Sequence, residues 1–423
     1  MSSLIASRTS PAKWRIIGPL IALAIAGGAV ARFATAGHDG ASRSVVAGPA
    51  AAPNPVSEAA VALRDAIETG DPSRYAAVDQ ALTTAGDAPG APAIHAALLL
   101  SRHQFTAART FISDALAKNP GDRALLGAAV DASVETGDYS AASQQLQTLV
   151  DLRPDGRALT RVSYLRELHG DMSGALAAMR QAEQAASEST EHATIITFLG
   201  DLCLTANDLS CAEASYTTAL QQRPNSTNAA LGQARLLAAR GNTLAAIDKA
   251  AALVARSPQP AAASLLGELR LATFDTPGAN EAFALVKANT RLLSAAGVVT
   301  DLEAAIFEAD HGDAGQAVAL ATSAYTARHT VLTADALGWA LTQAKRANEA
   351  LPYVRESLAL GTSSTAIHIH AAAAFLQTGD AARATDELRI ALRSNPWTSP
   401  NSRSVGIALS SSLSIDLPES WRP

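Results

Sequence analysis

Small apolar residues, polar turn residues and prolines repeat along this chain with a common period of about 34 residues. Alanines recur at intervals of 33 to 38 residues, at Ala108, Ala142, Ala175, Ala212, Ala246, Ala279, Ala317, Ala350 and Ala384. A glycine or asparagine followed by a polar residue stands a few positions before most of them, at Gly137-Asp138, Gly170-Asp171, Asn207-Asp208, Gly241-Asn242, Gly312-Asp313 and Gly379-Asp380. Prolines recur at Pro120, Pro154, Pro224, Pro258 and Pro396. The pattern predicts a repeating structural unit over residues 57–397.

Each series has a structural reason. The Gly-Asp or Asn-Asp pair ends one helix with a residue that tolerates positive φ, and it offers the next helix a capping side chain. The alanine lies where two antiparallel helices cross closely, and the proline ends the second helix. Neither helix of such a pair can cover its apolar stripe alone, so neighbouring units must stack. The sequence therefore predicts an all-α solenoid of antiparallel helix pairs that winds into a superhelix.

The chain on either side of the full units lacks this period. Residues 37–56 are rich in proline, glycine and alanine and predict a flexible linker. A weaker hairpin at 57–86, with Gly70-Asp71 as its turn, begins the array, and about nine full units follow. Residues 398–423 form a predicted C-terminal cap and tail, with one amphipathic helix from Asn401 to Ser411 and a frayed end around Leu417.

An apolar run from Ile16 to Ala31 follows three basic residues near the N-terminus. About 16 helical residues span roughly 24 Å, and extension to Ala36 with Arg32 snorkelling would let the helix cross a bilayer. The same segment also resembles a secretory signal with Ala34-Thr35-Ala36 as its cleavage site. Residues 1–36 are thus predicted to be a single-pass membrane anchor or, alternatively, a cleaved signal peptide. In both cases the basic flank places the repeats outside the cytoplasm, at the cell membrane or secreted.

Composition supports a helical interaction protein and argues against several function classes. Aromatic residues make up only 4% of the chain, alanine dominates the apolar residues, and the net charge is −6. Without a basic stripe, nucleic acid is not an expected partner. We find no catalytic or nucleotide-binding motif, so the sequence predicts no enzyme and no cofactor. His368 and His370 lie two positions apart on a predicted helix and point about 200° apart, so we expect no shared metal ion there.

The two cysteines lie on either side of the Asn207-Asp208 turn. Cys203 and Cys211 would face each other across an antiparallel hairpin, within reach of a disulfide bond. An oxidising compartment would favour that bond. The alternative is two reduced cysteines that pack as small apolar residues.

The repeat resembles the tetratricopeptide repeat (TPR) family, in the alanine-rich form common among actinobacterial members. The family's Leu-Gly pair in the first helix appears as Leu199-Gly200, Leu266-Gly267 and Leu337-Gly338. Its small residue at the helix crossing is the alanine series, and its large residue in the second helix appears as Tyr216 and Phe283. The resemblance implies a right-handed superhelical solenoid whose first helices line a concave groove. It also implies binding of proteins or peptides in that groove.

Projection of this register onto the first helices predicts a polar groove of mixed charge. The residues expected to line it are Tyr164, Glu167, Thr197, Asp201, Asn228, Arg235, Glu268, Asp335, Trp339 and Gln343. Trp339 is the one large aromatic residue among them, a type that interfaces favour; alternatively, it packs against the neighbouring unit. The predicted function is a non-catalytic scaffold of the cell envelope, and the alternative is an accessory or regulatory subunit of an enzyme or assembly machine. The sequence leaves the oligomeric state open.

Overall fold

The computed structural model describes residues 54–393 and 399–422 except residues 187 and 362. Within these ranges the chain forms 21 α-helices and one 3₁₀ helix, without a strand. The all-α solenoid predicted from the periodicity is confirmed there. The predicted signal or membrane helix at residues 1–36 lies outside the described residues, as do most of the linker and Pro396. Among the described helices, none combines the length and the apolar character that crossing a membrane requires.

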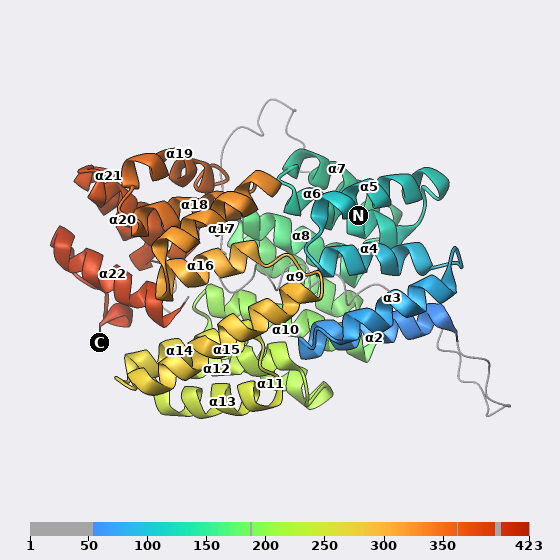
Figure 1. Ribbon diagram of the computed structural model, residues 1–423, viewed down its shortest axis with the longest axis horizontal. Coiled ribbons are helices and arrows are strands. Elements are labelled where there is room, and N and C mark those ends of the chain that lie inside the picture. Colours follow the sequence, from blue (N-terminus) through green and yellow to red (C-terminus); the bar gives the residue numbers. More distant parts are fainter. Residues whose placement is uncertain (1–53, 187, 362, 394–398, 423) are drawn as a thin grey trace.

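Twenty of the helices form ten consecutive antiparallel pairs (Figure 1). The pairs are α2 (Pro55–Thr69) and α3 (Arg74–Ala85), α4 (Ala91–Ser101) and α5 (Phe105–Lys118), α6 (Arg123–Glu135) and α7 (Tyr139–Leu152), α8 (Gly156–Leu168) and α9 (Met172–Ala185), α10 (Ser189–Thr205) and α11 (Leu209–Gln222), α12 (Thr227–Ala239) and α13 (Thr243–Arg256), α14 (Pro260–Ala272) and α15 (Thr276–Ala295), α16 (Asp301–His311) and α17 (Ala314–Ala327), α18 (Val331–Gln343) and α19 (Ala347–Ser357), α20 (Thr365–Gln377) and α21 (Ala381–Arg393). The last helix, α22 (Pro400–Leu413), has no partner helix of its own.

The turns inside the pairs have the geometry that the Gly-Asp pattern predicts. Positive φ occurs at Gly137, Gly170, Asn207, Gly241 and Gly379. The aspartates that follow Gly137, Gly170 and Asn207 cap the second helix by accepting a hydrogen bond from a backbone N–H three residues on. Gly312 is an exception, with φ of −134°. In three other pairs His103, Phe274 and Lys345 adopt the positive φ, which a search for glycine could not find.

The alanine series marks the closest helix crossings. All nine alanines have no exposed surface, because the two helices of each pair meet at these positions. Close packing also restricts which residues can face the large residue of the second helix. The Tyr216 ring lies between Gly200 and Gly232, where a methyl group on either glycine would come within 2.6 Å of a ring carbon. Glycine on the first helix is therefore what makes room for the aromatic ring.

The superhelix is closed, so that successive turns touch. The α2–α3 pair lies against the middle of the array instead of standing free at one end (Figure 1). Glu68 at the end of α2 forms an ion pair with Arg223, and its carbonyl oxygen accepts a hydrogen bond from Thr227 at 2.9 Å. Further along, Glu135 and Arg328, 193 positions apart, form a buried ion pair. The ends of α2 and α6 therefore contact units far along the chain as well as their own partners.

The C-terminal tail packs onto the array. Helix α22 lies against α20, α21 and α14, which agrees with the predicted capping helix. The prediction of a frayed C-terminal end is wrong, because Trp421 is wholly buried against Gly406. Arg403 donates hydrogen bonds to the carbonyl oxygens of Trp421 and Arg422, which ties the last described residues to α22.

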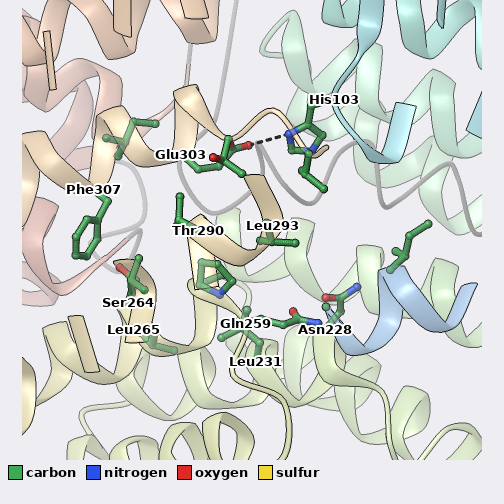
Figure 2. Close-up of a pocket in the computed structure, with 18 of the residues that line it drawn as sticks. His103, Asn228, Leu231, Gln259, Ser264, Leu265, Thr290, Leu293, Glu303 and Phe307 are labelled. Carbon is green, nitrogen blue, oxygen red and sulfur yellow. Dashed lines mark ion pairs between the residues drawn. The ribbon is translucent and has the colours of Figure 1, made fainter. Parts of the chain in front are cut away.

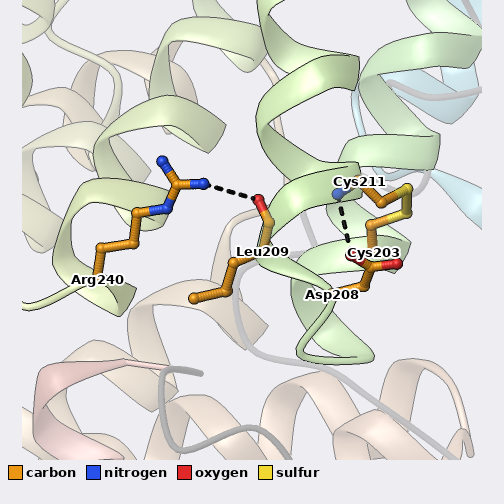
Figure 3. The surroundings of a disulfide bond; sticks show 5 residues. All are labelled: Cys203, Asp208, Leu209, Cys211 and Arg240. Atoms are coloured by element: carbon orange, nitrogen blue, oxygen red, sulfur yellow. Dashed lines mark hydrogen bonds between the residues drawn. A yellow bond between two sulfur atoms is a disulfide. The ribbon is translucent and has the colours of Figure 1, made fainter.

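A disulfide bond joins Cys203 and Cys211 across the turn between α10 and α11 (Figure 3). Their Cα atoms are 5.7 Å apart, within the range that a disulfide needs. Asp208 in the same turn caps α11 by accepting from the Cys211 N–H at 3.0 Å. The bond therefore closes a pair that already has a regular turn.

Candidate ligand cavity

A cavity of about 330 Å³ lies between the inner faces of successive units. Its walls come from α10, α12, α14, α15 and α16, and the end of α2 and the turn after α4 close it from the neighbouring superhelical turn. In Figure 2, Asn228 and Leu231 of α12 lie on one side of the cavity and Glu303 of α16 on the other. Because the superhelix is closed, its inner faces bound a cavity at this place. The sequence predicted an open groove here.

Three charged residues of the cavity occupy the same position in three successive units. Asp201, Arg235 and Glu268 follow one another at intervals of 34 and 33 residues, and each stands seven residues before the N-cap of the second helix, at Asp208, Asn242 or Asp275. Each lies on the first helix of its pair, which faces the inside of the superhelix. The equivalent residue of the next unit is Ile306, so Glu303 enters the cavity from a different position of α16. The repeat period therefore delivers one charged side chain from each of three units to the cavity wall.

Two of the carboxylates have donors within the protein. The Tyr216 hydroxyl donates to Asp201 at 2.8 Å. The Nε2 atom of His311 lies 3.3 Å from Glu268, and the backbone N–H of Asn401 at the start of α22 donates to the other oxygen of Glu268. These contacts satisfy both carboxylates without a ligand.

Asp310 and His311 form the acid–base part of the wall. Burial raises the pKa of Asp310 to about 6, even though the indole N–H of Trp339 donates to it at 2.8 Å. Burial alone would lower the pKa of His311, but the hydrogen bond and the negative charge of Glu268 outweigh burial and raise it. The His311 ring also stacks on Phe283 at 4.4 Å between centroids. This wall can take up protons near neutral pH.

Glu303 faces the turn after α4. The His103 ring lies beside it, with Nδ1 3.6 Å from a Glu303 carboxylate oxygen (Figure 2). The same Nδ1 lies 2.9 Å from the Val299 carbonyl oxygen. Both carboxylate oxygens of Glu303 are covered by protein atoms and have no hydrogen-bond partner among the described residues. Glu303 is therefore a contact between superhelical turns and is poorly placed to receive a ligand directly.

Arg235 differs from the other charged residues of the cavity. It is partly buried on α12 and is the only arginine or lysine among the described lining residues. It makes neither an ion pair nor a hydrogen bond with any other residue that the structure describes. A partly buried guanidinium without a partner retains its full capacity to bind an anion.

The predicted groove residues divide into two sets. Asp201, Asn228, Arg235 and Glu268 line the cavity. The others do not line it and are Tyr164, Glu167, Thr197, Asp335, Trp339 and Gln343. The prediction that Trp339 lines an exposed groove is wrong, because only 2% of this residue is exposed. Its ring stacks on that of His370, with 4.1 Å between the ring centroids. Trp339 packs against the neighbouring units, because His370 belongs to α20 and Asp310, which accepts its indole N–H at 2.8 Å, belongs to α16.

The two histidines singled out in the sequence have different partners. His370 lies 3.1 Å from Asp335, and His368 lies 2.6 Å from Glu387. Both histidines are buried in α20. Across the described part of the chain, no group of three or more histidine, cysteine, aspartate or glutamate residues could hold a metal ion.

Sequence reasoning missed the part of the wall that comes from other turns. Tyr75 and His103 reach the cavity through closure of the superhelix, and no periodic signal marks them. Glu303 had no such signal either, because the residue of its unit that is equivalent to Asp201, Arg235 and Glu268 is Ile306.

Comparisons with known proteins agree with the helical repeat. Residues 99–162 match the family model described as tetratricopeptide repeat. No curated protein matches the sequence. The fold is similar to a chain of the APC/C hetero-tetramer Cut9–Hcn1, at 16% identity over 83% of this chain and 62% of that one, with a TM-score of 0.38. It is also similar to a tetratricopeptide repeat protein from Parabacteroides merdae, at 16% identity, 60% and 98% coverage, and a TM-score of 0.35.

A third similar structure is human IFIT1 in a dimer with PPP-AAAA, at 13% identity, 80% and 85% coverage, and a TM-score of 0.44. The chain spans less than two thirds of the Cut9–Hcn1 chain that it resembles. Residues 99–162 thus match the tetratricopeptide repeat family model, and the same helix-pair architecture is stacked ten times along the described chain.

Proposed function

We propose that this protein is a non-catalytic scaffold of the cell envelope that binds partner proteins on the inner side of its repeat array. The observation that carries this proposal is the set of side chains at one repeat position, Asp201, Arg235 and Glu268, gathered around a single cavity. Tetratricopeptide repeats generally bind other proteins through the face formed by their first helices. The cavity of about 330 Å³ would admit a short segment of a partner and exclude a long peptide.

The envelope location rests on the amino-acid sequence of residues 1–36. Its basic flank and apolar run support a membrane anchor or an export signal. The disulfide of α10 and α11 is in keeping with an oxidising compartment. Fractionation of cells that produce the full chain tests this part. Recovery of the unprocessed chain in the cytosol would refute the envelope location.

Partner binding is tested with a variant that fills the cavity. Ser264→Trp places an indole at the lining of the cavity on α14, and Ala252→Trp places the same group on the exposed outer face of α13 as a control. We expect cross-linked partners of the wild-type chain to be lost with Ser264→Trp and retained with Ala252→Trp. Retention of the same partners by both variants would contradict binding in the cavity. A single stoichiometric partner would favour the accessory-subunit function over a general scaffold.

A further inference from the structure

The charged groups of the cavity fall into two classes: those that already have hydrogen-bond partners within the protein and those that do not. Asp201 and Glu268 accept hydrogen bonds from Tyr216 and Asn401, and Asp310 accepts one from Trp339. The oxygens of Glu303 are covered by protein atoms, so a ligand cannot reach them without displacing the wall. Arg235 alone combines an available charge with a place in the cavity lining. The unsatisfied charged group that a ligand can reach is therefore a cation, and its natural complement is an anion.

Much of the exposed surface of the cavity wall is apolar. Leu231 lies one helical turn before Arg235 on α12, and Phe198, Leu265, Leu293, Ile306 and Phe307 line the cavity from neighbouring helices. Burial of an apolar group against this wall removes hydrocarbon surface from water. A small inorganic anion would leave this surface unused.

We propose that the cavity binds an organic acid whose carboxylate pairs with Arg235 and whose apolar remainder packs against the surrounding leucine, isoleucine and phenylalanine side chains. The planar guanidinium can bind both oxygens of a carboxylate at once. Asn228 lies seven residues before Arg235, on the same side of α12, and its amide also lines the cavity. About 10 Å of helix separates the two positions, which suits a ligand that extends from Arg235 toward Asn228.

This ligand chemistry has two sources. One is a free acid with an apolar chain, and the other is the C-terminal residue of a partner protein when that residue is apolar. Only the second source rests on the proposed function. The two are separated by comparing decanoate with an acetylated tripeptide that ends in leucine.

Isothermal titration of the full chain tests the proposal. The ligands are decanoate, its neutral counterpart decanamide, acetate, and the leucine-ended tripeptide as free acid and as amide. The variant is Arg235→Gln, and the matched control is Arg256→Gln, which removes an exposed arginine from the outer face of α13. Because Arg235 has no partner in the described structure, both variants should fold with the same thermal midpoint.

We expect decanoate or the peptide acid to bind the wild-type chain and the Arg256→Gln control alike. Arg235→Gln and the neutral amides should each weaken binding by about tenfold or more, since a charge-assisted hydrogen bond is lost. Preference for decanoate identifies a free acid, and preference for the peptide acid identifies a protein terminus. The proposal is overturned if neither acid binds, if Arg235→Gln binds as well as the control, or if acetate binds as tightly as decanoate. In any of these cases partner loss with Ser264→Trp would still support the proposed function.

Discussion

Replacement of Asp310 by asparagine should remove a pH-dependent loss of stability that the buried carboxyl imposes. The change keeps an oxygen that can accept the Trp339 N–H, now 2.8 Å from Asp310, and removes only the ability to ionise. Burial raises the pKa of Asp310 from 3.8 to about 6. The folded state therefore prefers the protonated form, so the wild-type protein loses stability as the pH rises from about 4 through 6.

The size of this loss follows from the pKa difference. A shift of about two units corresponds to about 3 kcal/mol once the group is fully ionised in both states. About half of that, roughly 1.4 kcal/mol, falls between pH 5 and pH 7.5, because the loss begins at the unfolded-state pKa. His311, whose raised pKa acts in the same direction, is present in both proteins. The negative charge of Asp310 contributes to that raised pKa, so Asp310→Asn also reduces the pH dependence that comes from His311.

Urea unfolding at pH 5 and pH 7.5, followed by tryptophan fluorescence and by circular dichroism, measures the effect. We expect the advantage of Asp310→Asn over the wild type to grow by about 1.4 kcal/mol between the two pH values. The control Asp248→Asn removes an exposed carboxyl from α13 and corrects for the loss of one negative charge. An advantage of Asp310→Asn that is the same at both pH values would refute the reasoning.

Three further changes test the packing. Gly232→Ala would put a methyl group 2.2 Å from the Tyr216 ring and should cost about 1–3 kcal/mol in urea unfolding, whereas Gly121→Ala, with open space around it, should cost less. Trp421→Ala should cost about 3–5 kcal/mol and speed hydrogen exchange in α22; unchanged exchange would contradict tight packing of the tail. The disulfide joins positions eight residues apart, and its reduction should lower the free energy of unfolding by about 2.5 kcal/mol. An unchanged unfolding midpoint would show that the bond does not constrain the unfolded chain.

The repeat unit could be predicted from the sequence because its determinants are local. An alanine at a helix crossing and an aspartate at an N-terminus act on helices adjacent in the chain, so their spacing records the unit directly. Closure of the superhelix could not be predicted in this way. It depends on pairs such as Glu135 and Arg328, 193 positions apart, and on small rotations between units that leave no periodic mark in the sequence.

The candidate site shows the same division. Asp201, Arg235 and Glu268 were found because register alone places them on the inner face. Trp339 was assigned to the same face, but it is buried against Asp310 and His370 of the two adjacent units. The sequence also could not predict that Arg235 is available to bind a ligand. That depends on which of the carboxylates of the cavity already have donors.

Contact between successive superhelical turns also bears on how the chain folds during synthesis. In an open array each unit depends only on its neighbours, so folding could follow the ribosome one unit at a time. Here the end of α2 is completed by Arg223 and Ser257, and the turn after α4 by Gly297 and Val299. The first units must therefore wait for more than half of the chain to emerge. Such distant pairings raise the contact order and should make the protein fold more slowly, and unfold more nearly as one block, than an open array of the same length.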